Sequence, residues 1–260
     1  RLFERIYRPL GIEAVFVENK DGRRAYACQT VIDATGDADV FCRMGAKTLS
    51  GDNFLSFWGY YADLAGAREA AETKSIRPGV KICALGADAN GKGHPEGRPP
   101  LRGISAQAVT DFLVWGRRAA LEMLESSPPD TLAFTGLPGM AQFRTTRMIA
   151  GAYALAYGDQ QAHFDDAVGC CGDWRKAGVA FEIPYRALRA PGVKNVLAAG
   201  RNISCADRDA WEVTRVIPVA ALTGEAAGIA AAMSPGGDVH RADAGKIAAA
   251  MAASGHRIRL

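Results

Sequence analysis

Short apolar runs, each closed by turn residues, organise the first fifty positions of the chain. Residues 12–18 and 25–28 are two such runs, and the Asn-Lys-Asp-Gly segment at 19–22 between them predicts a β-hairpin. A third run begins at Val31 and ends at Gly36, after which a helix is predicted from Asp37 to Met44. The pattern therefore indicates a hairpin followed by a buried strand that leads into a helix.

The last quarter of the chain repeats the order of a strand and then a helix. Residues 193–200 form a second apolar run that ends at Gly200. Pro218 suits the first turn of a helix that continues to Met233, and residues 243–254 predict one more helix. Strand-and-helix units at both ends of the chain favour an α/β domain.

The residues between these ends have a different pattern. An aromatic run at 54–61 predicts a strand, and the Gly- and Pro-rich segment 86–103 predicts a loop. Residues 105–125 have apolar positions at helical spacing, with Ser105 as the N-cap. We therefore expect an inserted α+β domain over residues 51–190, which interrupts an α/β domain formed by 1–50 and 191–260.

Composition narrows the class of protein. The 260 residues are 48% hydrophobic and 23% charged, which is typical of a globular chain and excludes wholesale disorder. A formal net charge of +3 gives no electrostatic case for nucleic acid, and no apolar run reaches the roughly 20 residues that cross a bilayer. We expect neither nucleic acid nor a membrane as partner, and a homodimer as the candidate assembly.

The six cysteines show no C-x-x-C motif and no spacing suited to zinc, so we expect no metal site. The vicinal pair Cys170 and Cys171 is either redox-active or a pair of ordinary reduced thiols, and the second interpretation is favoured. Reduced thiols and the lack of a signal-like segment predict a cytoplasmic protein. The sequence begins with Arg1 rather than Met, and we expect an N-terminal portion of the native protein to be missing.

The two strands that end in glycine have a physical use. Small residues at the carboxyl end of a parallel strand let a ligand lie against the main chain, and the N-terminus of a following helix favours a negative group. One such unit is weak evidence, but two that enter one sheet strengthen the case. The sequence therefore predicts that the segments near Gly36 and Gly200 meet to hold a dinucleotide.

Several motifs, in order along the chain, resemble those of the FAD-dependent oxidoreductases with a glutathione-reductase-type flavin domain, specifically the FAD-oxidored group. The matching stretches are VIDATGDAD (31–39), FRTTRMIAG (143–151), IPYR (183–186), NVLAAGRNIS (195–204), TRVIP (214–218) and GEAAG (224–228). The resemblance implies a Rossmann-like FAD-binding domain interrupted by a substrate (cap) domain, with FAD as the cofactor.

The resemblance also implies positions for the cofactor. Ala34, Thr35, Gly36 and Asp37 would lie beside the adenosine part of FAD. Gly200 and Arg201 would lie near the pyrophosphate and the ribityl chain. The helix that begins at Val216 and Ile217 would direct its N-terminus at the flavin ring, where the positive end of its dipole stabilises charge on the reduced ring.

This sequence departs from the family pattern in two places. It has no G-x-G-x-x-G turn, because Gly91, Gly93 and Gly97 have the wrong spacing, and we therefore expect the opening βαβ unit of the family to be missing from this sequence. The loop between 168 and 178, which usually carries a histidine in the family, has none here.

Three arginines are the candidate catalytic residues. By resemblance, Arg144 and Arg147 belong to the substrate side as an anion clamp or proton donor; the alternative is a solvated pair at a domain boundary. Arg215 belongs to the family motif at the start of the helix. Asp209, Glu212 and His163 are weaker candidates for acid–base chemistry.

Two hypotheses follow. The first is an FAD-dependent oxidoreductase that exchanges a hydride between the flavin and a small polar substrate. The second is a truncated, non-catalytic relative that serves binding or assembly. Motifs of serine hydrolases, phosphate loops and zinc proteases are absent from the sequence.

Overall fold

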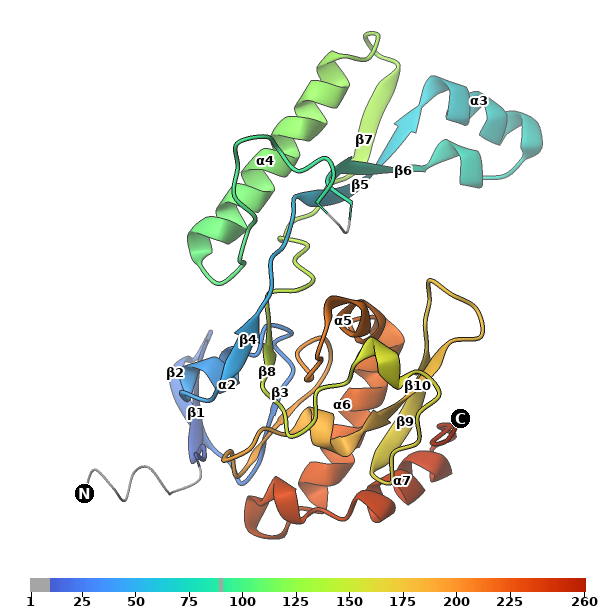
Figure 1. Ribbon diagram of the computed structural model, residues 1–260. Coiled ribbons are helices and arrows are strands. Elements are labelled where there is room, and N and C mark those ends of the chain that lie inside the picture. Colours follow the sequence, from blue (N-terminus) through green and yellow to red (C-terminus); the bar gives the residue numbers. More distant parts are fainter. Residues whose placement is uncertain (1–9, 89–90) are drawn as a thin grey trace. The chain divides into compact units, whose positions relative to one another are not determined.

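The computed structural model describes residues 10–88 and 91–260, and it mixes helices and strands as an α/β protein does. Residues 1–9 lie outside the described residues. The expectation of a missing N-terminal portion concerns this start of the chain. The chain forms two compact units. Unit 1 is Arg1–Ser50 with Arg147–Leu260, and unit 2 is Gly51–Thr146 (cyan to green in Figure 1).

One predicted domain boundary coincides with the observed division, and the other does not. The chain enters unit 2 after residue 50 as expected, but it returns to unit 1 at Arg147 rather than at residue 191. The physical reason is packing: Ile149, Val168 and Ile183 are fully buried in the same core as Leu197. The corrected inserted unit is therefore 51–146.

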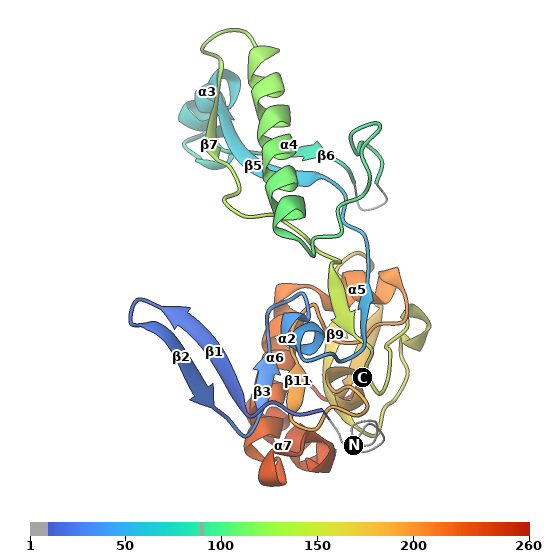
Figure 2. The same ribbon diagram turned by 90° about the vertical axis from the view of Figure 1, so that its left-hand side faces the viewer.

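Unit 1 is built around two parallel strands that are far apart in the sequence. Val31 pairs with Val196 and Asp33 pairs with Ala198, so the two strands run side by side (Figure 2). The elements of unit 1 are β1 (Ala14–Asn19), β2 (Gly22–Ala27), β3 (Val31–Asp33), α2 (Asp39–Arg43), β4 (Thr48–Ser50), β8 (Arg147–Ile149), β9 (Ala167–Gly172), β10 (Ala180–Pro184), β11 (Val196–Ala198), α5 (Arg208–Thr214), α6 (Ile217–Ala232) and α7 (Ala244–Ala253).

Helix α6 packs against β3, β9 and β11 because its buried positions are small. Ala226, Ala227 and Ala230 are fully buried in the core of unit 1, and small side chains let a helix approach a sheet closely. Pro218 stands in its first turn, as the sequence predicted.

The predicted hairpin forms, with Ala14 opposite Ala27 and Asn19 opposite Gly22. All of β2 and most of β1 are exposed, and Figure 2 shows both strands clear of the β3–β11 pair. At its base, Asn195 joins the hairpin to the start of β11: its side-chain amide donates to the main-chain oxygens of Ile12 (2.7 Å) and Gln29 (2.8 Å).

Unit 2 is a three-stranded antiparallel sheet in the order β6-β5-β7, packed against a long helix. Phe57 of the sheet lies against Gly116 of the helix, where a Cβ atom would stand 2.0 Å from the ring. Ser105 caps this helix by accepting from the amide of Ala108 at 3.1 Å, as predicted. The elements of unit 2 are β5 (Ser56–Asp63), α3 (Leu64–Thr73), β6 (Lys81–Gly86), α4 (Ala106–Glu125) and β7 (Leu132–Gly136).

Much of the polar segment 205–212 is helical. Helix α5 begins after Asp207, whose carboxylate accepts from the amide of Ala210 at 2.8 Å, and its Trp211 and Val213 are buried. A short helix with one buried face was not evident from a run of charged residues. No single helix within 10–88 and 91–260 has the length and apolar character to cross a membrane; α5 and α6 reach that length only together, across a 79° bend.

Candidate functional site

The carboxyl ends of β3 and β11, with the loops that follow them, form what we call the strand-end site (residues 33–39 and 199–202). In parallel sheets, ligands bind beyond the carboxyl ends of the strands. Because β3 and β11 are paired in parallel, the two glycine-bearing loops leave the sheet at the same edge. The sequence prediction that these two segments meet is thus confirmed.

Asp33 shapes the loop after β3. Its buried carboxylate accepts from the amide of Thr35 (3.1 Å) and its hydroxyl (2.7 Å), and from the amides of Val40 (3.0 Å) and Phe41 (3.2 Å) at the start of α2. The residue directly before α2, Ala38, has no side chain that can cap the helix. Asp33 therefore caps α2 from a distance and sets the path of residues 34–38.

Gly36 lies beneath the side chain of Arg201. A Cβ atom on Gly36 would stand 2.6 Å from Cζ of Arg201, so the guanidinium would have to shift to admit one, and the φ of +80° favours glycine. Arg201 also forms an ion pair with Asp37, with 3.0 Å between Nη2 and Oδ1. Gly36 and Asp37, which were predicted to contact the adenosine, thus lie in direct contact with Arg201, which was predicted to lie near the pyrophosphate.

Gly200 follows β11 and has a φ of +85°. If it carried a Cβ atom, the nearest neighbour would be Cβ of Ala220, at 3.7 Å. Its amide donates to the hydroxyl of Thr223 on α6 at 2.9 Å, and this hydroxyl donates to the oxygen of Val219 at 2.7 Å. A Cβ atom at Gly200 would therefore meet no close contact, but the residue is buried and its amide proton is already used within the protein.

Two residues that the sequence did not single out hold the loops together. The side-chain amide of Asn202 donates to the main-chain oxygen of Asp33 at 2.9 Å, and the indole of Trp211 donates to that of Arg201 at 2.6 Å. Two buried atoms, Oδ1 of Asn202 and Nε of Arg201, have no hydrogen-bond partner among the described residues. Such atoms usually have a partner, so they indicate a polar group of a ligand or water at this place.

The candidate arginines 144 and 147 belong to different units. Arg147 begins β8 and donates from Nε to the oxygen of Asp37 (2.9 Å), and it pairs with the carboxylate of Asp39. Arg144, in unit 2, donates from Nη1 to the oxygen of Gln142 at 3.0 Å. Arg147 thus supports the strand-end site from the side, and the anion clamp of the two arginines stays a prediction.

Arg215 forms an ion pair with Glu212, one turn earlier, and both side chains are largely buried. Asp209 is similarly paired with Arg175 (2.7 Å), and His163 lies 3.4 Å from the buried Glu182. Each candidate for acid–base chemistry therefore already has a charged neighbour within unit 1.

A cavity of about 440 Å³ lies beside the start of α6. Val216 lines it and caps α6 without a side-chain hydrogen bond, whereas Ile217 is 85% exposed. Cys170 and Cys171 also line the cavity, and burial raises the pKa of the Cys171 thiol to about 12. A thiol with a raised pKa is a poor nucleophile, in keeping with ordinary reduced cysteines.

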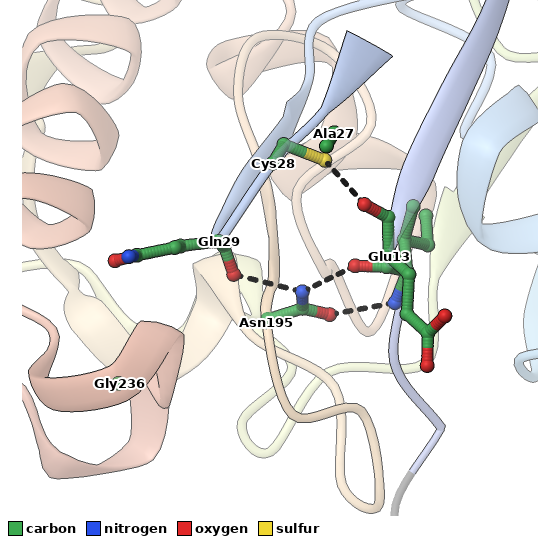
Figure 3. A pocket seen from close by; sticks show the side chains of 7 residues that line it. Glu13, Ala27, Cys28, Gln29, Asn195 and Gly236 are labelled. Carbon is green, nitrogen blue, oxygen red and sulfur yellow. Dashed lines mark hydrogen bonds between the residues drawn. The ribbon is translucent and has the colours of Figure 1, made fainter. Parts of the chain in front are cut away.

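A second cavity, of about 430 Å³, lies at the base of the hairpin, and Figure 3 shows Asn195 in it with its hydrogen bonds to the flanking main chain. This cavity is at the amino end of the parallel pair, because the amide of Val31 donates to the oxygen of Asn195 at 2.9 Å. It therefore lies at the opposite end of the strands from the strand-end site.

Within the described part of the chain, no group of three or more His, Cys, Asp or Glu residues is arranged to hold a metal ion.

A family model described as FAD dependent oxidoreductase matches residues 105–249, more than half of the chain. The chain belongs to this family. The match includes Gly200, Arg201 and Arg215 but begins after residues 34–37. No curated protein and no solved structure matches the chain.

The sequence pattern alone did not single out Asp33, Asn202, Trp211 or Thr223. Asp33 and Asn202 each lie within a stretch that resembles the family, so their polar side chains next to a buried strand were an available signal. Thr223 and Trp211 gave none, because a threonine or tryptophan within a helix shows its partner only in the tertiary structure.

Proposed function

We propose that this chain binds FAD at the strand-end site and belongs to an enzyme that exchanges a hydride between the flavin and a small polar substrate. One observation carries the proposal: Gly36 and Gly200, far apart in the sequence, lie at the same edge of a parallel pair, with unpartnered buried polar atoms beside them. In this proposal, unit 1 holds the cofactor in a Rossmann-like arrangement and unit 2 is the substrate domain.

The residues of the strand-end site fit a dinucleotide in three respects. The loop 34–37 begins with the exposed Ala34 and Thr35, so a ligand can reach its main chain. Arg201 provides a cation for a phosphate group. Oδ1 of Asn202 provides an acceptor that no described residue uses.

FAD, when bound, supplies a ring that accepts or donates a hydride. The protein's own contribution is to orient it. Asp33 fixes the loop after β3, and Thr223 fixes the main chain of Gly200. The N-terminus of α6, next to Arg215, provides positive potential for an anionic group.

The test is direct. The purified protein is examined for flavin absorbance between roughly 350 and 500 nm, and its melting temperature is measured with FAD and with FMN. A ligand of the native state raises the melting temperature. We expect FAD to raise it more than FMN, because FMN has no adenosine to contact residues 34–37.

A second function is a non-catalytic relative used in binding or assembly. It is favoured by Arg201, whose guanidinium fills the space above Gly36, and by the amide of Gly200, which is already bonded. The absence of both flavin absorbance and an FAD-dependent shift would contradict the first proposal and support this one.

A further inference from the structure

The guanidinium of Arg201 lies where a ligand would have to contact Gly36. Measured from the position of a Cβ atom on Gly36, Cζ, Nη1 and Nη2 of Arg201 stand at 2.6, 2.8 and 3.0 Å. All three distances are at or below the closest approach that real Cβ atoms make, so the group rests directly on the glycine main chain. The space above Gly36 can hold this guanidinium or part of a ligand, but not both.

The side chain of Arg201 is held less firmly than its main chain. The oxygen of Arg201 accepts from the indole of Trp211 at 2.6 Å, and the preceding Gly200 is bonded to Thr223. The guanidinium has one ion pair, with Asp37, and its buried Nε has no partner among the described residues. The side chain can therefore move while the loop stays in place.

The ion pair itself is partly exposed: 33% of the Arg201 side chain and 22% of the Asp37 side chain are accessible. Exposed pairs of this kind contribute little to stability, whereas a paired phosphate and guanidinium form strong, often bidentate, hydrogen bonds. A phosphate group is therefore a better partner for Arg201 than Asp37 is.

We propose that the Asp37–Arg201 pair is a latch over Gly36, which a pyrophosphate-bearing ligand opens by replacing Asp37 as the partner of Arg201. The inference rests on the proposed function, since it concerns the same site. Asp37 then lowers the affinity for the ligand, because its carboxylate competes with the phosphate. The main chain of Asp37 stays in place when the latch opens, since Arg147 holds its oxygen.

To test the latch, the affinity for FAD is measured by calorimetry in the wild type, in Asp37→Asn, in Arg201→Gln and in the double variant. We expect Asp37→Asn to bind FAD roughly fivefold more tightly, the equivalent of one weak ion pair. Arg201→Gln should bind more weakly, and the gain from Asp37→Asn should vanish in its presence. Asp39→Asn is the matched control, because it removes the same charge two residues further on, at the start of α2, where the carboxylate pairs with Arg147 instead of Arg201.

A second readout follows the protein itself. Inorganic pyrophosphate is titrated while the side-chain nitrogen signal of Arg201 and the fluorescence of Trp211 are recorded. We expect the Arg201 signal to move in the wild type and the fluorescence of Trp211 to stay unchanged, since its indole is bonded to the Arg201 main chain, which does not move. In Asp37→Asn the movement should occur at lower pyrophosphate concentration.

The outcomes separate the two proposals. FAD binding of equal strength in the wild type and Asp37→Asn, or an equal gain in Asp39→Asn, would overturn the latch and leave the proposed function standing. Movement of the Arg201 signal by pyrophosphate without any FAD binding would support the latch and contradict the flavin assignment. Neither ligand acting on any variant would overturn both.

Discussion

Asn202 joins the two halves of the strand-end site by donating from its side-chain amide to the main-chain oxygen of Asp33, at 2.9 Å. The two residues are 169 positions apart in the sequence. Asn202 is fully buried. The bond therefore fixes the loop after β11 against the end of β3.

Replacement of Asn202 by alanine should lower the free energy of unfolding by about 0.5–1.5 kcal/mol, because it removes one buried hydrogen bond to the oxygen of Asp33, which keeps the amide of Ala199 as a donor. It should also reduce the FAD-dependent rise in melting temperature. Chemical unfolding and thermal shift measure the two effects. Asn53→Ala, which removes a similarly buried amide from unit 2, is the control: if it lowers the FAD-dependent rise to the same extent, the role given to Asn202 is contradicted.

Gly36→Ala should destabilise the protein more than Gly45→Ala does. Gly36 has a φ of +80° and Gly45 a φ of +84°, so each substitution costs about 1–2 kcal/mol of backbone strain. Gly45 has open space around it, whereas a Cβ on Gly36 would also meet Arg201. Urea unfolding measures the difference, and the variant Gly36→Ala with Arg201→Ala should remove it. Equal losses for the two glycines would show that Arg201 does not rest on Gly36.

The pair Arg215 and Glu212 should stabilise helix α5 as a unit. Arg215→Met leaves the buried carboxylate of Glu212 unpaired, which should cost about 1–3 kcal/mol. The double variant Arg215→Met with Glu212→Leu should recover most of this loss, because no buried charge remains. A double-mutant cycle gives the coupling. Additive losses would show that the pair is not coupled, and a loss of activity alone would favour a purely catalytic Arg215.

The stability that Asp173 contributes to the folded protein should be lost at acidic pH. Hydrogen bonds from Arg175 hold the pKa of this carboxyl at about 2, below its ordinary value of 3.8, and the hydroxyl of Tyr157 adds another at 3.0 Å. Because the folded state has the lower pKa, the stabilisation is complete above about pH 4 and is lost as the pH falls towards 2.

Unfolding by urea at pH values from 6 to 2 measures this dependence. Asp173→Asn should be less stable at neutral pH and should lose less stability between about pH 4 and pH 2 than the wild type does. Asp165→Asn is the control, because its side chain is fully exposed. An unchanged slope in Asp173→Asn would contradict the assignment.

Local sequence patterns predicted the elements whose turn and cap residues lie within the element or next to it. The hairpin, the helix after Ser105 and the helix at Pro218 carry their turn, cap and first-turn residues within a few positions. The short strands β8, β9 and β10 lack such signals, since their partners lie elsewhere in the chain. The boundary at residue 190 was misplaced for that reason: only the shared core shows that Ile149 and Ile183 belong with Leu197.

The sequence by itself determined the hairpin, the helices that begin after Ser105 and at Pro218, and the two glycines that follow the buried strands, because these depend on neighbours within a few residues. Only the tertiary structure decided that β3 pairs with β11, that Arg201 covers Gly36, and that Asn202 and Trp211 hold the loops together. Those contacts join residues that no local pattern relates, and they form only when the packing of the core brings distant segments to one edge.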